Sequence, residues 1–265
     1  MLISVIIPVY NSERIIERSI NSVILAMKGN SYEIICIDDG SKDGSLKVLN
    51  ELHEKNPNII IVHQENAGAA AARNRGLEIA KGGFVAFNDS DDEWLPEHFD
   101  ILKNAFDDNP ELFCVAGNHD VEKQKTLFLK KIKGNVSCVT LKKELVKNYY
   151  SPQATMFKRD IVERGIRFKD GMRYAEEGYF FYQIVHTYPS GFINKQVSKS
   201  ILGKEKFGDG GLSGNLKMME KGELYNLKFA HIDLGIGFTY YCMMVLLSYI
   251  KYCRRIIITK FRAIK

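Results

Sequence analysis

The sequence predicts an α/β fold, in which a mostly parallel sheet is covered by helices on both faces. Apolar runs alternate with segments of helical period through the first 90 residues, an order typical of parallel strands joined by helices. The chain of 265 residues is 45% apolar and 26% charged, so it can bury enough apolar surface to offset the entropy of folding. A chain that is disordered throughout and a small scaffold held by disulfides are therefore excluded.

Four apolar runs predict the first strands of this sheet. Each run is nearly continuous rather than alternating, which is typical of strands buried on both faces of a parallel sheet. The runs are Leu2–Val9, Glu33–Ile37, Ile59–His63 and Phe84–Asn88. We expect helices between them. Asn11 and Ser12 are residue types that cap a helix, so the first helix is expected to follow them. The next two helices are predicted over Gly44–Lys55 and Gly68–Ala80.

Polar clusters follow three of these strands, each at the strand's carboxyl end. The clusters are Tyr10 with Asn11, Asp38 with Asp39, and the acidic segment 89–92. Ligands of open parallel sheets bind outside this end of the strands. No GxGxxG follows the first strand, and the chain has no GxxxxGK[ST] loop. A nucleotide diphosphate bound here therefore needs another positive partner, and a divalent cation is suited to that role.

The section from residue 110 to 200 has weaker periodicity. Short apolar runs predict strands over Leu112–Gly117, Asn135–Thr140 and Ala154–Lys158. Helices are expected over Leu141–Tyr149, Asp160–Gly165 and Glu176–His186. A loop rich in glycine and lysine is expected over Gly203–Gly214.

The net charge of +5 is concentrated at the C-terminus. The last 15 residues hold six basic side chains and no acid, so the other 250 residues sum to −1. A nearly neutral body argues against a nucleic-acid partner. Five scattered cysteines without a CxxC spacing are typical of reduced thiols, and no secretory signal is visible. We therefore expect a cytoplasmic protein.

The segment 234–250 contains 17 residues without a formal charge, and the basic tail follows it. A helix needs about 20 apolar residues to span a bilayer. The pattern favours an interfacial helix that contacts a membrane through residues 234–265, because apolar burial and attraction to anionic lipid would add. The alternative is a core helix or a helix of a homodimer. We treat 216–265 as a helical segment that associates with membranes or oligomerises.

Four motifs occur in order along the chain, and together they are far more specific than any one alone. They are Pro8-Val9-Tyr10-Asn11, Asp38-Asp39-Gly40-Ser41-Lys42-Asp43-Gly44, Asn66-Ala67-Gly68 with Ala72-Arg73-Asn74, and Asp89-Ser90-Asp91-Asp92. This set resembles the family 2 glycosyltransferases, which are inverting enzymes with the GT-A fold. The resemblance covers roughly residues 1–215. It implies a GT-A domain there, with a nucleotide-binding half at 1–110 and an acceptor-binding half at 111–215.

The resemblance implies roles for residues on the donor side. Tyr10, near Pro8, is expected to pack against the nucleotide base, and Asp39 to accept the ring N–H of that base, usually uracil. Arg73 is expected to reach the base or the phosphates. Lys206, in the late loop, is expected to reach the diphosphate.

The same resemblance implies a metal site at the acidic segment. Asp91 is expected to be the metal ligand, and Asp89 its partner near the ribose or the metal. Oxygen ligands suit Mn²⁺ or Mg²⁺. Taken alone, the acidic segment is also typical of a turn that caps the helix after Pro96.

The resemblance also places a general base within the pair Glu176 and Glu177. In the family the second acid of such a pair is the base, and it is usually Asp. Glu177 stands at that place, and Glu176 is the alternative. Glu is one methylene longer than Asp, and a displacement of about 1 Å can cost ~100-fold in rate. Either the pocket is shaped for Glu, or Glu176 is the base, or the activity is weak.

The expected function is that of a metal-dependent inverting glycosyltransferase. It would move a sugar from a nucleotide-diphospho-sugar, with a UDP-sugar favoured, to a hydroxyl of a glycan or lipid-linked acceptor. The expected setting is cell-surface polysaccharide synthesis at the inner face of the plasma membrane. A non-catalytic sugar-nucleotide-binding module and a sugar nucleotidyltransferase are the alternatives. The latter needs a glycine-rich loop with lysine and arginine, which residues 8–20 lack.

Overall fold

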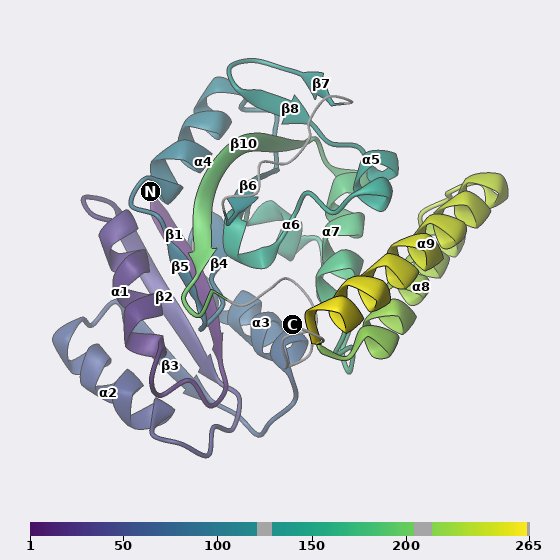
Figure 1. Ribbon diagram of the computed structural model, residues 1–265. Helices are drawn as coiled ribbons and strands as arrows, with labels where there is room; N and C mark the ends of the chain where they lie inside the picture. The colour runs from purple at the N-terminus through teal and green to yellow at the C-terminus, as the bar shows by residue number, and fades with distance from the viewer. Residues whose placement is uncertain (121–128, 204–213, 264–265) are drawn as a thin grey trace.

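The computed structural model describes residues 1–120, 129–203 and 214–263. These residues form one mixed sheet of ten strands with helices on both faces, and a helical hairpin stands beside it (Figure 1). The strand order is β3-β2-β1-β4-β9-β6-β10-β8-β7, and β5 pairs with β10. The predicted α/β class, the mostly parallel sheet of the first half and the helical tail are confirmed.

The first half of the chain follows the prediction closely. Its parallel strands are β1 (Leu2–Val9), β2 (Ser31–Asp38), β3 (Ile59–His63) and β4 (Phe84–Phe87). Its helices are α1 (Ile16–Ala26), α2 (Ser45–Lys55) and α3 (Ala69–Ile79). Side chains of β1 alternate between two cores, since Val5 packs with α1 and α2, whereas Ile6 packs with α3. The alternation places helices on both faces.

The predicted cap of α1 is wrong. The helix begins at Ile16, and no side chain caps it. The Ser12 carbonyl accepts the backbone N–H groups of Ile15 and Ile16 instead. Asn11 has a positive φ of 49°, and its side chain accepts the N–H of Lys42 at 2.7 Å. The Asn11 side chain therefore ties the end of β1 to the turn after β2.

The second half is a mixed sheet with short elements. They are β5 (Asp92–Trp94), α4 (His98–Asp108), β6 (Cys114–His119), β7 (Lys130–Lys131), β8 (Val136–Cys138), α5 (Leu141–Val146), a 3₁₀ turn at Pro152–Ala154, β9 (Thr155–Lys158), α6 (Asp160–Glu163), α7 (Glu176–Thr187) and β10 (Ser190–Ser200). Strand β9 is antiparallel to both β4 and β6. Strand β10 is parallel to β6 and antiparallel to β5 and β8.

Strands β5 and β10 differ from the sequence prediction. Asp92 begins β5, so the acidic segment leads into a strand and not into a helix. Helix α4 begins later, at His98, and no acidic side chain caps it. The long β10 has mixed polarity and shifts register at Gln196, which explains why no strand period marks it in the sequence.

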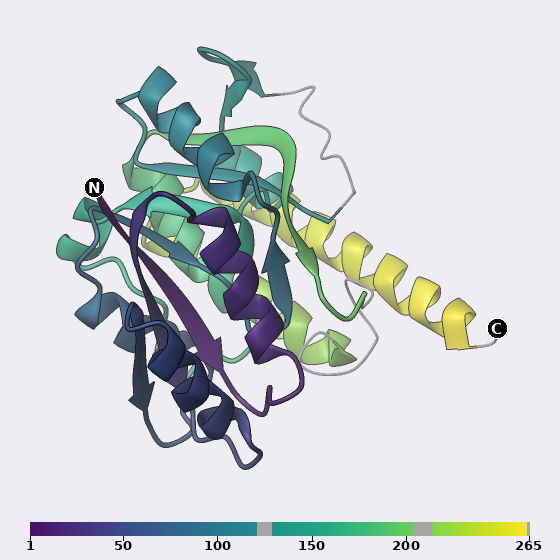
Figure 2. The ribbon, with the colours of Figure 1, turned by 90° about the vertical axis from the view of Figure 1, so that its left-hand side faces the viewer.

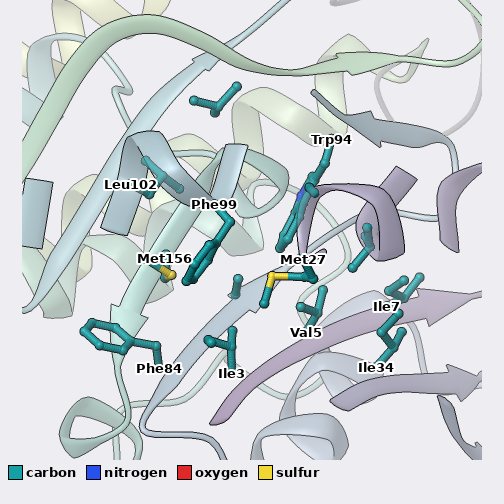
Figure 3. Packing of buried hydrophobic residues seen from close by; sticks show 14 of the residues in the cluster. Ile3, Val5, Ile7, Met27, Ile34, Phe84, Trp94, Phe99, Leu102 and Met156 are labelled. Carbon is teal, nitrogen blue, oxygen red and sulfur yellow. The ribbon is translucent and has the colours of Figure 1, made fainter. Parts of the chain in front are cut away.

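A buried cluster supports the segment that connects β4 and β5. Figure 3 shows Trp94 above Met27 and Val5, and Phe99 above Ile3 with Met156 beside it. Trp94 is stacked on His98 with ring centroids 3.7 Å apart. Packing of this kind fixes the direction in which the chain leaves β4.

The tail forms two helices, α8 (Leu216–Ile232) and α9 (Phe238–Ala263), joined by a short turn. They pack on each other and on α5 and α7 through a third apolar cluster, which includes Tyr182, Leu227 and Met244. Helix α9 begins after Gly237 and continues well past residue 250, so the uncharged stretch and the basic tail form one helix. Within the described ranges, no helix is both long and apolar enough to cross a membrane.

Candidate active site

Two cavities meet at the carboxyl ends of β1 and β4. The larger has a volume of about 480 Å³ and the smaller about 290 Å³. Both are lined by Arg73, Asp89, Asp91 and Glu176, so the two cavities form one cleft. The cleft lies where ligands of open parallel sheets bind.

The smaller cavity holds three of the predicted donor-side residues, Pro8, Tyr10 and Asp39. The Tyr10 side chain projects into solvent and is 49% exposed. The Asp39 carboxylate is nearly buried and accepts the backbone N–H groups of Ala67 and Gly68, each at 2.8 Å. Its Oδ1 also accepts Gln64 Nε2 at 2.7 Å. Asp39 therefore fixes the segment between β3 and α3 against the end of β2.

Arg73 lies between the two halves of the cleft. It comes from α3, is only 4% exposed, and its guanidinium donates to Asp89 Oδ1 at 2.6 Å and to Glu176 Oε1 at 3.0 Å. The guanidinium also lies 5.3 Å from the centroid of the Phe168 ring. Burial lowers the pKa of this group, but the two carboxylates outweigh burial and raise it above the usual value. Arg73 is therefore a permanent buried charge that joins two acids from distant parts of the chain.

The acidic segment is held on both sides by backbone contacts. Ser19 Oγ donates to the Asp89 carbonyl at 3.1 Å, and the N–H of Ile201 donates to the Asp91 carbonyl at 2.8 Å. Ser12 and Ser90 share a hydrogen bond of 2.8 Å. Helix α1 and the end of β10 thus fix the segment, while the carboxylates of Asp89 and Asp91 face the cleft.

The donor atoms here fit a divalent cation that arrives with a phosphate ligand. In the part of the chain that the structure describes, no group of three or more His, Cys, Asp and Glu side chains could hold a metal alone. Asp91 and Asp89 supply carboxylate oxygens, although Asp89 Oδ1 already accepts Arg73. Mg²⁺ is commonly held by one or two carboxylates together with phosphate oxygens and water. The two aspartates match that pattern.

The two glutamates at the start of α7 have different surroundings. Glu176 is buried and pairs with Arg73. Glu177 is partly exposed and lines the larger cavity. Burial raises the pKa of Glu177, and the negative charge of Glu176 raises it further, while Arg73 opposes the shift. Glu177 is therefore a carboxyl group that faces the cavity and binds a proton more readily than an ordinary glutamate.

Helix α8 holds the segment that precedes these glutamates. Ala175 has the left-handed conformation, with φ 55° and ψ 29°. Its carbonyl accepts Asn226 Nδ2 at 2.7 Å and the N–H of Gly178 at 3.1 Å. Gly222 lies so close that an added Cβ would stand 2.3 Å from the Tyr174 carbonyl oxygen. An uncommon backbone state of this kind persists only where the surroundings enforce it.

The other wall of the larger cavity contains residues that no motif identifies. His119, at the end of β6, lies 3.2 Å from Asp120 Oδ2 and 3.7 Å from Asp92 Oδ1. The loop 148–153 completes this wall, and the buried Glu144 accepts the N–H of Tyr149 at 2.9 Å. Burial raises the pKa of Glu144 to about 8. The pairing of β6 with β10 places His119 at this wall of the cavity, and no spacing of residues in the sequence predicts that position.

Eight of the nine predicted site residues line the cleft. They are Pro8, Tyr10, Asp39, Arg73, Asp89, Asp91, Glu176 and Glu177. Lys206 lies outside the described residues. The structure thus brings distant positions into one cleft, and the most distant of them, Pro8 and Glu177, are 169 residues apart in sequence.

The close approach of α8 gives a test by substitution. Gly222→Ala should gain up to about 1 kcal/mol from helix propensity, but the clash with Tyr174 should cost about 1–3 kcal/mol. We expect a lower free energy of unfolding, measured by urea denaturation. Lys228→Ala, at an exposed position of the same helix, is the control and should be nearly neutral. A Gly222→Ala protein more stable than the parent would contradict the contact.

Comparison with known proteins agrees with this geometry. The sequence profile described as glycosyl transferase family 2 matches residues 4–166. The poly(ribitol-phosphate) beta-glucosyltransferase of Bacillus spizizenii is 43% identical over 95 residues, which are 35% of this chain and 15% of that protein. The matched part of this chain covers between 14% and 54% of the length of these curated relatives.

Solved structures show the same fold. S. aureus TarS 1–349 in complex with UDP-GlcNAc has a TM-score of 0.69 at 20% identity, over 92% of this chain and 70% of that chain. The mannosyltransferase PcManGT of Pyrobaculum calidifontis, in complex with GDP-Man and Mn²⁺, has a TM-score of 0.65 at 18% identity, over 92% and 68%. The fold is therefore that of the GT-A glycosyltransferases. Because the family profile matches more than half of its residues, the chain belongs to glycosyl transferase family 2.

Proposed function

We propose that this protein is a metal-dependent inverting glycosyltransferase. It transfers a sugar from a nucleotide-diphospho-sugar, with a UDP-sugar favoured, to a hydroxyl of a glycan or lipid-linked acceptor. The setting that we propose is cell-surface polysaccharide synthesis at the cytoplasmic face of the plasma membrane. Family membership supports the reaction class, and the TarS complex with UDP-GlcNAc supports the donor class.

One observation carries this proposal. Asp91, which follows β4, and Glu177, which begins α7, line the same cavity although 86 residues separate them in sequence. A glycosyl transfer by single displacement needs a site for the leaving diphosphate and a base for the attacking hydroxyl. The cleft offers carboxylates at both places, and hydrogen bonds from α1 and α8 fix the segments that carry them.

The smaller cavity would hold the nucleoside. Tyr10 offers an exposed ring for stacking beside Pro8. A carboxylate has about four acceptor sites, and three of those on Asp39 are taken by Ala67, Gly68 and Gln64. One site remains for the ring N–H of a base. In this proposal, Lys206 reaches the diphosphate from the late loop.

A cation, Mn²⁺ or Mg²⁺, would be held by Asp91 with Asp89 beside it. When bound, it would stabilise the negative charge that grows on the departing nucleoside diphosphate. Asp89 also accepts Arg73, so the guanidinium lies close to the phosphate site without leaving its ion pairs. We therefore assign Arg73 a positioning role within the donor site.

Glu177 is the general base in this mechanism. Its carboxylate takes the proton of the acceptor hydroxyl while that oxygen attacks the anomeric carbon, and the bond from this carbon to the phosphate oxygen breaks. A single displacement of this kind inverts the anomeric configuration. The salt bridge of Glu176 to Arg73 favours Glu177 over Glu176 for the role. The contacts of α8 with residues 174–175 support a pocket shaped for the longer glutamate side chain.

Substitution of the base is the first test of this function. Glu177→Gln should lower kcat by about 10²–10⁴-fold, the usual contribution of a general base, while the Kd for the UDP-sugar stays within twofold. Release of UDP from a panel of UDP-sugars and calorimetric donor binding measure the two quantities. Glu176→Gln, which keeps a hydrogen-bond acceptor for Arg73, should retain more activity.

A fully active Glu177→Gln protein beside an inactive Glu176→Gln protein would contradict the assignment of the base. A product with retained anomeric configuration would contradict single displacement. A protein that binds UDP-sugars and never releases UDP would be a non-catalytic binding module.

The cation gives a second test. Excess chelator should abolish UDP release, and Mn²⁺ or Mg²⁺ should restore it. Asp91→Ala should cost about 3–4 kcal/mol of the barrier, the value of one preorganised electrostatic group. Asp100→Ala, at an exposed position of α4, is the matched control. Undiminished turnover in excess chelator would exclude a metal-dependent reaction.

The raised pKa of Glu177 predicts the pH dependence. The base acts only when it is deprotonated, so kcat/KM should rise with pH through a pKa above the usual 4.5 of glutamate. Glu176→Gln removes a negative charge that raises this pKa, so the acidic limb of the profile should move to lower pH. An acidic limb that stays in place in Glu176→Gln would show that another group titrates.

A further inference from the structure

Helix α9 leaves a row of large apolar side chains uncovered. Met243, Leu246, Ile250, Ile257 and Phe261 are each between 53% and 68% exposed. Their spacing of three, four, seven and four residues places them along one side of the helix. We call this row the α9 stripe. The opposite side of α9, which includes Met244, packs on α8 and α5.

The stripe lies beside basic side chains. Arg254 is exposed within the stripe, four residues after Ile250 and three before Ile257, and the exposed Lys260 borders the stripe three residues after Ile257. No acidic residue occurs from residue 234 to the C-terminus of the chain. Lys251 and Arg255 turn towards the protein, since Lys251 Nζ donates to the Val146 carbonyl at 2.6 Å. Burial raises the pKa of Glu223, and the nearby positive charge of Arg255 opposes that rise.

The helix is placed so that the stripe can meet a flat surface. Figure 2 shows α9 running past the other elements, so that its C-terminal part extends away from the sheet. Among the residues described, no helix has the length and hydropathy of a membrane span. A helix with one apolar side and flanking cations is typical of a segment that lies in the interface of a bilayer.

From the stripe and the basic side chains within and beside it, we infer that α9 docks on the surface of an anionic phospholipid bilayer. The apolar side chains enter the interface, while Arg254 and Lys260 contact lipid phosphates. A second copy of the chain is a poorer occupant. Symmetric packing of two stripes would bring cations of both copies together, with no acid on either α9 to pair with them.

Docking would also orient the cleft. Helix α8 contacts the start of α7 through Asn226 and pairs with α9 in one hairpin. The hairpin therefore links the lipid-facing stripe to the glutamates of the cleft. The consequence, that a lipid-linked acceptor is presented to Glu177, rests on the proposed function, whereas the docking itself does not.

Vesicle sedimentation of the full chain tests the inference without any donor or acceptor. The protein should sediment with phosphatidylcholine vesicles that contain 30% phosphatidylglycerol. Binding should be at least about tenfold weaker to vesicles of phosphatidylcholine alone, and also in 0.5 M NaCl, which is the effect expected from two or more basic contacts.

Ile250→Glu should weaken binding at least tenfold. Leu25→Glu on α1 is the matched control, since Leu25 and Ile250 are 56% and 57% exposed. Arg254→Gln with Lys260→Gln should weaken binding to the anionic vesicles about tenfold.

A gain of signal makes the test independent of folding defects. The chain has one tryptophan, the buried Trp94. Leu246→Trp adds a second, exposed tryptophan, and its fluorescence emission should shift to the blue when anionic vesicles are added.

A wild-type protein that stays in solution with anionic vesicles at low salt would overturn the inference. A dimer that Ile250→Glu dissociates, in a protein that binds no vesicles, would also overturn it. An active enzyme that ignores vesicles overturns this inference alone, and a bound but inactive one overturns the proposed function alone.

Discussion

The buried guanidinium of Arg73 is the contact on which the cleft depends. It joins Asp89, 16 residues away, to Glu176, 103 residues away. A buried charge is stable only when it is paired, and the removal of one partner commonly costs about 3–5 kcal/mol. The pairing therefore fixes the loop after β4 against the start of α7. Because Glu177 follows Glu176 directly, the same pairing sets where the Glu177 carboxyl group stands relative to Asp91, and this group lines the cavity.

The C-terminal helices belong to this arrangement. Helix α8 encloses the left-handed Ala175 between Asn226 and Gly222, and α9 covers the other side of α8. The hairpin therefore supports the segment that carries the glutamates, and it also presents apolar and basic side chains to the outside. The same pair of helices therefore carries the proposed membrane-docking surface and supports the start of α7 in the cleft.

The strong local patterns of the first half were sufficient to predict it. Strands such as Leu2–Val9 and Phe84–Phe87 are continuous apolar runs, and polar residues that line the cleft follow their ends. The predicted cap at Asn11 and Ser12 failed because the Asn11 side chain accepts the N–H of Lys42, in the turn after β2, and the Ser12 hydroxyl pairs with Ser90. His119, Asn226 and Glu144 could not be predicted, since β6, α8 and α5 bring them into place only through tertiary packing. The roles of the cleft residues stay predictions.

A crystal structure of the Glu177→Gln protein with a UDP-sugar and Mn²⁺ tests the central claim most directly, because the slowed reaction keeps the donor intact. The account predicts uracil beside Tyr10, the diphosphate joined through the ion to Asp91, and the anomeric carbon facing residue 177 with room for an acceptor oxygen between them. A donor bound outside this cleft, or one whose anomeric carbon faces away from α7, would contradict it.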